Sequence, residues 1–168
     1  FIGPPADSAE WSDQGVEGSA RFLHRVWRLY QGVSLPKPSM QHATRTISES
    51  DRDLLRAAHI AIRRVTDDIA RFHFNTAIAA LMEGVNTATK AVASWEDDAP
   101  EVRNRALRYL AQTLVSLAQP FVPHLACECW EVLGGSDLWA APWPSWDEAH
   151  LVRDTIGRAP NGKVDYRA

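Results

Sequence analysis

The sequence has little cysteine and no long hydrophobic run. Its two cysteines, Cys127 and Cys129, are separated by one residue, and side chains at that spacing rarely form a disulfide. We therefore expect no disulfide framework and a reducing compartment, the cytoplasm. The chain has no run of about 18 apolar residues and does not open with a charged and then apolar leader. These absences argue against a membrane span and a secretory signal.

The sequence also lacks the glycine-rich loops and catalytic motifs that indicate an enzyme active site. Gly15 and Gly18 alone match neither a dinucleotide-binding nor a P-loop pattern. No nucleophile elbow or zinc-protease motif occurs. The best candidates for a metal site are His124, Cys127 and Cys129, but on a helix Cys129 points away from the other two. We expect buried cysteines there, and neither a catalytic nor a metal site in this chain.

Neither sign of charge is in large excess. Lysine and arginine number 18 against 21 aspartate and glutamate residues, which gives a formal net charge of −3. An argument for nucleic-acid binding must therefore rest on a local patch. The 168 residues, of which 45% are hydrophobic, suffice for one domain with its own core. Because the chain begins at Phe1 rather than at methionine, we expect it to be part of a longer protein.

Apolar residues recur at three- and four-residue steps in five stretches, and this periodicity predicts five helices. Ser50 and Asp53 have the spacing of a capping box, and Asn75 has the side chain of an N-cap. In chain order, the expected helices begin at or after Ser12, Ser50, Asn75, Pro100 and Pro123.

The segments between and after these helices carry turn and loop residues. Residues 33–47 are polar and contain prolines, which predicts a long surface loop, and an acidic break covers residues 94–100. Gly134 and Gly135 end the last helix, and a segment rich in tryptophan and proline follows, here called the strap (residues 136–150). Period-two alternation is absent, so we expect no strands outside the last dozen residues. The expected fold is all-α, a bundle of about five helices with an irregular C-terminal strap.

The first helix separates its arginines from its apolar side. Arg21, Arg25 and Arg28 fall within about 60° on a helical wheel, away from the apolar stripe. Fifteen of the 18 basic residues are arginine, whose planar fork suits phosphate oxygens. The expected stripe consists of Val16, Ala20, Leu23, Val26, Trp27 and Tyr30.

The second helix repeats this pattern, and on neighbouring helices the two rows would form one surface that tracks a phosphate backbone. The alternative is an ordinary solvated side, because an amphipathic helix must place charged groups toward water. Adjacent carboxylates on the same helix diverge by about 100°, which favours surface ion pairs over acid–base chemistry. The expected basic row is Arg52, Arg56, His59 and Arg63, and the expected pairs are Asp67 with Arg71 and Asp68 with Arg64.

Three blocks of sequence resemble the helical anticodon-binding domain of bacterial-type leucyl-tRNA synthetases, which are class I aminoacyl-tRNA synthetases. The first is EWSDQGVEGSARFLHRVW at residues 10–27. The second is VTDDI at residues 65–69 with FNTAIAALME at residues 74–83. The third runs from PFVPH at residues 120–124 to APWP at residues 141–144. The blocks occur in family order, and the resemblance covers about nine-tenths of the chain.

The resemblance implies a domain that docks leucine-accepting tRNA for an enzyme that attaches leucine with ATP and magnesium. The nucleotide-binding HIGH and KMSKS motifs of that family do not occur here, so we expect the fragment itself to be inactive and to hold no cofactor. Its implied partners are tRNA and the catalytic and editing domains of the same polypeptide. The implied organisation is a lead-in from the catalytic domain (residues 1–11), the helical domain (12–150) and the truncated start of a C-terminal segment (151–168).

Five arginines are the expected tRNA-binding residues. In the resemblance, Arg21 and Arg25 coincide with a basic pair that faces tRNA, and Arg28 shares their side of the helix. Arg56 and Arg63 come from the basic row of the second helix. Two alternatives remain open: the corresponding domain of an isoleucyl-, valyl- or methionyl-tRNA synthetase, and a structural or protein-interaction bundle that binds no RNA.

Overall fold

The computed structural model describes Gly3, Asp7, Ser8, Glu10 and residues 12–32, 48–94 and 101–151. These residues form helices and no strand, so the expected all-α bundle is confirmed for them. The expected loop at 33–47, most of the acidic break, Pro100 and the C-terminal residues 152–168 lie outside the described residues. The helices are α1 (Asp13–Gly32), α2 (Glu49–Ala70), α3 (Phe74–Ala93), α4 (Glu101–Ala118), α5 (Pro123–Val132) and the short 3-10 helix η1 (Glu148–His150).

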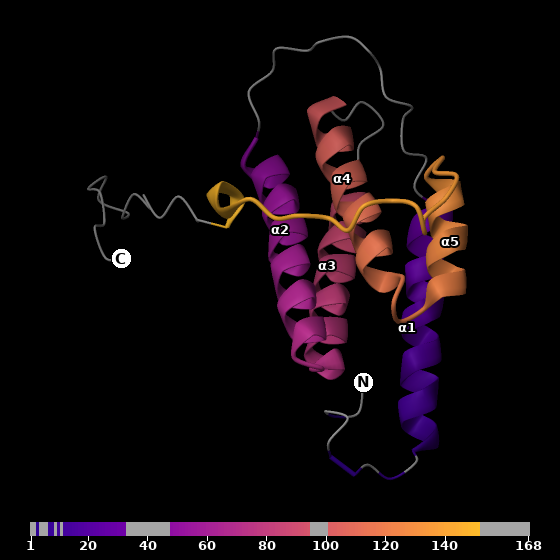
Figure 1. The fold of residues 1–168 in the computed structure, drawn as a ribbon. Helices are drawn as coiled ribbons and strands as arrows, with labels where there is room; N and C mark the ends of the chain where they lie inside the picture. The colour runs from indigo at the N-terminus through magenta and orange to yellow at the C-terminus, as the bar shows by residue number, and fades with distance from the viewer. Residues whose placement is uncertain are drawn as a thin grey trace, which may run out of the picture.

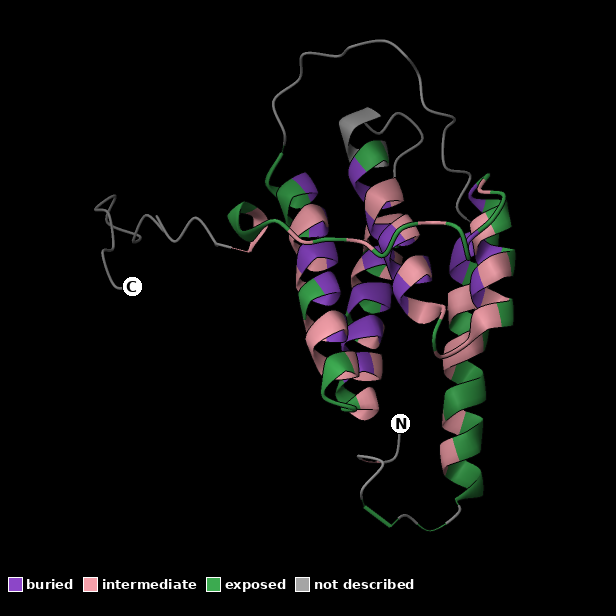
Figure 2. Ribbon diagram, in the orientation of Figure 1, coloured by how far each residue is buried: buried purple, intermediate pink, exposed green. Residues whose placement is uncertain are grey.

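Helices α2, α3 and α4 pack against one another and form the centre of the bundle, and α1 and α5 lie together at one side (Figure 1). The N-terminal half of α1 extends beyond the other helices and is largely exposed (Figure 2). Its expected apolar stripe is therefore only partly covered: Val16 is 47% exposed, whereas Tyr30 is buried. None of the described helices has the length and apolar character needed to cross a membrane.

The core consists of the apolar sides that the periodicity predicted, with closer packing than the pattern revealed. On α4, Ala106, Leu110, Leu114 and Leu117 recur at steps of four and three residues, and all four are buried. On α3 the buried positions are mostly small residues, which lets the helix approach α4 closely. At Gly84 an added Cβ atom would overlap the Cδ2 atom of Leu114, so a leucine of α4 occupies the space that a side chain would need.

The connection between α2 and α3 is only a few residues long and contains a strained residue. The N–H of His73 donates to the carbonyl of Asp68 (2.8 Å), and the N–H of Phe72 donates to the carbonyl of Ile69 (3.0 Å). This is the Schellman arrangement, in which the residue just after the cap takes a left-handed conformation that favours glycine. Here that residue is Phe72, with φ at +59° and a side chain that is 67% exposed.

Two helix starts differ from the sequence prediction. The capping box of α2 is formed by Ser48 and Asp51 rather than by Ser50 and Asp53. The Oγ atom of Ser48 accepts from the N–H of Asp51 (3.2 Å), and Asp51 Oδ2 accepts from the N–H of Ser48 (3.1 Å). Asn75 is not the N-cap of α3 because the helix already begins at Phe74.

The break between α4 and α5 agrees with the prediction, and the structure adds the course of the strap. Pro123 occupies the first turn of α5, where its missing N–H costs nothing. Gly134 ends the helix with φ at +80°. The strap then runs from α5 across α4 to α2 (Figure 1). The Nε1–H of Trp143 donates to Thr66 Oγ1 (2.9 Å) and attaches the strap to α2.

Candidate nucleic-acid interface

Three arginines form a row along α1. Arg21, Arg25 and Arg28 follow one another at steps of four and three residues, so they share one side of the helix over about two turns. All three are exposed, and the side chain of Arg21 is 72% exposed. The prediction that these residues point toward solvent on a common side is confirmed.

Two neighbours on α1 set the local environment of this row. Arg21 Nη1 lies 3.3 Å from Glu17 Oε2, but both side chains are more than 70% exposed, so the pair contributes little and leaves the guanidinium accessible. The guanidinium carbon of Arg25 lies 5.5 Å from the ring centroid of Phe22, within cation–π distance. The helical wheel of the arginines alone did not indicate a role for Glu17 or Phe22. Their spacing of four and three residues from the arginines is the signal that would have found them.

The two arginines expected on α2 are less available than those on α1. The Arg56 side chain is only 19% exposed, and its Nη1 atom lies 3.8 Å from Asp53 Oδ1. Arg63 is 45% exposed, and its Nη1 atom lies 3.9 Å from Glu148 Oε2 at the end of the strap. The expectation of one combined surface is wrong for the described residues. Helices α1 and α2 are not in contact, and α3 and α4 lie between them (Figure 1).

His59 does not belong to an exposed basic row. It is 6% exposed, and its Nδ1 atom accepts a hydrogen bond from the backbone N–H of Asp147 (3.0 Å). Burial lowers the pKa of His59 from its ordinary value of 6.5, and the neighbouring His150 adds to this effect, while the Asp147 charge opposes it. The end of the strap covers this part of α2, which the local spacing of residues could not show.

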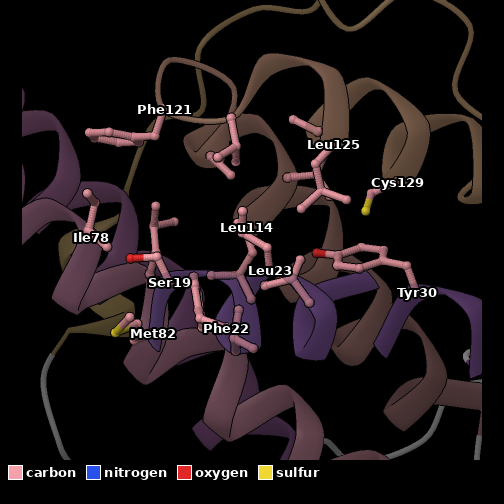
Figure 3. Close-up of a pocket in the computed structure, with 17 residues that line it drawn as sticks. Ser19, Phe22, Leu23, Tyr30, Ile78, Met82, Leu114, Phe121, Leu125 and Cys129 are labelled. Carbon is pink, nitrogen blue, oxygen red and sulfur yellow. The ribbon is translucent and has the colours of Figure 1, made fainter. Parts of the chain in front are cut away.

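A cavity of about 170 Å³ lies between α1 and the rest of the bundle. Its lining is almost entirely apolar, with Phe22 and Leu23 of α1 facing Ile78 and Met82 of α3 (Figure 3). Helix α1 is held beside this cavity by Tyr30, whose hydroxyl donates to the carbonyl of Ala111 (2.8 Å). The cavity offers no set of polar groups for acid–base chemistry, and no signal in the sequence indicated it.

The remaining polar candidates form no reactive centre among the residues that the structure describes. No three His, Cys, Asp or Glu side chains there come close enough together to hold a metal ion. Cys129 is 1% exposed, and its burial, with a smaller effect of the Glu128 charge, raises the pKa of the thiol to about 12. Arg64 pairs with Glu83 of α3, a contact between helices in place of the expected one with Asp68.

Residues 51–167 of the chain match the family described as the anticodon-binding domain of tRNA ligase. A leucine–tRNA ligase of Geotalea daltonii is 42% identical over 159 residues, which cover 93% of this chain and 19% of the relative. A leucine–tRNA ligase of a Geobacter species is 45% identical over 170 residues, covering 98% of this chain and 20% of the relative. That of Acinetobacter baylyi is 44% identical over 167 residues, covering 98% and 18%.

A solved structure shares the fold. It is the crystal structure of a ternary complex of an Agrobacterium radiobacter LeuRS with tRNA and LeuAMS. It superimposes with a TM-score of 0.64 at 31% sequence identity, over 86% of this chain and 18% of that chain. This chain therefore spans about a fifth of the length of the relatives that it matches.

Proposed function

The chain belongs to the family of anticodon-binding domains of tRNA ligases, and from this membership we propose that it is the tRNA-docking domain of a leucine–tRNA ligase. The curated relatives that cover nearly all of it carry that name, and the solved structure that shares its fold contains tRNA. The whole enzyme joins leucine to tRNA with ATP and magnesium in the cytoplasm. Catalytic and editing domains of the same polypeptide supply that chemistry, and this domain supplies docking.

The observation that carries this proposal is the exposed arginine row on α1. Arg21 lies in the N-terminal half of α1, which extends away from the bundle, and Arg25 and Arg28 lie on the same exposed side of its C-terminal half. Because all three side chains are exposed, the row is accessible to an RNA backbone along about two turns of the helix. The net charge of −3 does not oppose this, because phosphate attraction acts over roughly 10 Å or less at moderate salt.

The chemistry of the row favours phosphates over bases. Exposed guanidinium groups donate to phosphate oxygens with two parallel N–H groups, and such contacts position RNA without reading its sequence. The cation–π contact with Phe22 restricts the guanidinium of Arg25 and so lowers the entropy lost when a phosphate binds. In this proposal Arg56 and Arg63 are secondary contacts, because both are partly covered and paired with carboxylates.

A titration of the 168-residue chain with leucine tRNA at about 50 mM and about 200 mM salt tests the proposal. Binding should weaken steeply as salt rises. The double variant Arg21→Ala with Arg25→Ala should bind about tenfold more weakly at the lower salt, and its salt slope should fall by roughly 0.7–0.9 for each lost phosphate contact.

The matched control is the double variant Arg71→Ala with Arg105→Ala, which removes the same two charges from exposed positions outside α1. It should bind almost as the unchanged chain does. An equal loss in both double variants would show general attraction and refute the α1 site.

Tighter binding of isoleucine, valine or methionine tRNA would assign the chain to a sister ligase. Salt-independent binding, or none by a chain that remains helical, would leave a structural bundle.

A further inference from the structure

The end of the strap is held on α2 by a buried imidazole. Helix η1 lies beside α2 (Figure 1), and the His59 ring stacks on the His150 ring with centroids 4.5 Å apart and planes at 14°. The Nδ1 atom of His59 also accepts a hydrogen bond from the backbone N–H of Asp147 (3.0 Å). The centroid of the His59 ring lies 5.5 Å from that of the Tyr109 ring on α4. His59 therefore contacts the strap through both a hydrogen bond and a ring surface.

The hydrogen bond from Asp147 determines the chemical state of His59. A backbone N–H can only donate, so Nδ1 must carry a lone pair and the proton of the neutral ring must lie on Nε2. A proton added at Nδ1 would place two donors against each other. The bond to Asp147 and a protonated His59 therefore exclude one another.

The other contacts at this end of the strap are made by groups other than His59. Glu148 Oε2 lies 3.9 Å from Arg63 Nη1, and Glu148 Oε1 accepts from Trp146 Nε1 (3.0 Å). The carboxylate of Asp147 accepts from the N–H of Ala149 (2.9 Å) inside η1. His59 is the group here whose pKa burial lowers from its ordinary value of 6.5, so its hydrogen bond to the strap is the contact that responds to acid.

We propose that His59 is an acid-sensitive latch: the neutral imidazole holds residues 147–150 of the strap on α2, and protonation at Nδ1 releases them and uncovers the surface around Arg63. The contact between His59 and residues 147–150 thus switches α2 between a state that the strap covers and a state that it leaves open. It concerns the packing of the bundle and does not depend on what α1 binds.

The charges around His59 set the direction of the switch. His150 on the strap, and Arg56 and Arg63 one turn away on α2, disfavour a positive charge on His59, while Tyr109 of α4 stays neutral. Asp147 and Glu148 on the strap favour a positive charge. Burial and His150 lower the pKa of His59, and Asp147 offsets this only in part. The latch is therefore closed at neutral pH, and its contribution to stability is lost as the pH falls below about 6.5.

The test follows both sides of the contact by NMR on the 168-residue chain, between about pH 7.5 and pH 5. Imidazole ¹⁵N shifts report protonation of His59, and amide exchange, corrected for its intrinsic pH dependence, reports release of residues 147–150. In the unchanged chain, protonation of His59 should coincide with an increase of about tenfold in the exchange rate of the Asp147 amide.

Three variants separate the latch from a merely structural histidine. His59→Asn keeps an acceptor near the Nδ1 position but cannot gain a proton, so the strap should stay closed in acid. His150→Asn removes a neighbouring positive charge, so the transition should move to higher pH. His124→Asn changes an exposed histidine on α5 and should leave the transition in place.

Three results would overturn the proposal. One is an acid transition that persists in the His59→Asn variant, and another is a transition abolished by His150→Asn, which would assign it to that ring. The third needs no variant: His59 gains its proton in the unchanged chain while the exchange rates of residues 147–150 stay constant. That last measurement decides the question even where His59→Asn disturbs the packing.

Discussion

Phe72 offers a sharp test of the backbone between α2 and α3. It occupies the left-handed position of a Schellman motif, and Gly134 occupies the same position at the end of α5. In a helix interior, alanine is more stable than glycine. At Phe72 we predict the reverse order: the Phe72→Gly variant should be more stable than the Phe72→Ala variant.

The magnitude follows from the exposure of the ring and the sign of φ. Phe72 is 67% exposed, so its ring retains about a third of a full burial, roughly 0.5–1 kcal/mol, which both variants lose. The left-handed conformation costs a non-glycine residue about 1–2 kcal/mol. Glycine avoids that cost but loses roughly 0.5–1 kcal/mol more in backbone entropy. The glycine variant should therefore be more stable than the alanine variant by about 0.5–1 kcal/mol.

Urea unfolding followed by far-ultraviolet circular dichroism measures the difference as a midpoint shift of about 0.3–0.5 M. Substitutions at two other positions serve as controls for this stability difference. At Gly134 an added Cβ meets no atom within 4 Å, so Gly134→Ala should lose a similar amount through the backbone alone. At Asn86, exposed within α3, Asn86→Ala should be more stable than Asn86→Gly by about 1 kcal/mol.

The reasoning would be refuted if alanine and glycine had the same order at Phe72 as at Asn86. It would also be refuted if the Phe72→Gly variant unfolded at lower urea than Phe72→Ala while Gly134→Ala was harmless. Either result would mean that the residue after the α2 cap is not in the left-handed region.

Three further predictions concern packing, thiol reactivity and the arginine row. Gly84→Ala should lower the free energy of unfolding by about 1–2 kcal/mol in thermal or urea unfolding, because overlap with a leucine of α4 outweighs the gain in helix propensity. Unchanged stability would show that the helices can move apart. With a thiol reagent at about pH 8, Cys127 should react while Cys129 stays protected until the chain unfolds, since burial raises the pKa of the Cys129 thiol to about 12. Equal reaction rates of the two thiols would contradict the burial of Cys129. Glu17→Gln removes the carboxylate beside Arg21 and should raise tRNA affinity about two- to fivefold at low salt. This gain should vanish at high salt. A loss of affinity would argue against phosphate contact by this row.

Local sequence signals predicted the helices well, because helix formation depends on the spacing of side chains that are close together in the chain. The turn at Pro123 and the end of α5 at Gly134 follow from the restricted or permissive backbone of single residues. The apolar side of α4 follows from a period that any packed helix must have. The arginine row on α1 is of the same kind, since one helical turn places its members on one side.

The start of α2 shows where local signals become ambiguous. The sequence contains two serine–aspartate pairs with the same spacing, Ser48 with Asp51 and Ser50 with Asp53, and either can form a capping box. The structure uses the first pair, so the helix begins before the predicted cap. The start of α3 was missed for a related reason: the Schellman turn at Phe72 leaves so little chain between the helices that α3 begins ahead of Asn75.

The sequence by itself determined which segments are helical, which side of each helix is apolar and that three arginines of α1 face solvent together. Only the tertiary structure decided what covers each side. It separates α1 from α2, ties Arg63 to Glu148 and places His59 beneath a strap that begins more than 70 residues later in the chain. Helical periodicity repeats within a few residues and is readable locally. The identity of a covering segment depends on contacts between distant parts of the chain, and these depend on the packing of the whole bundle.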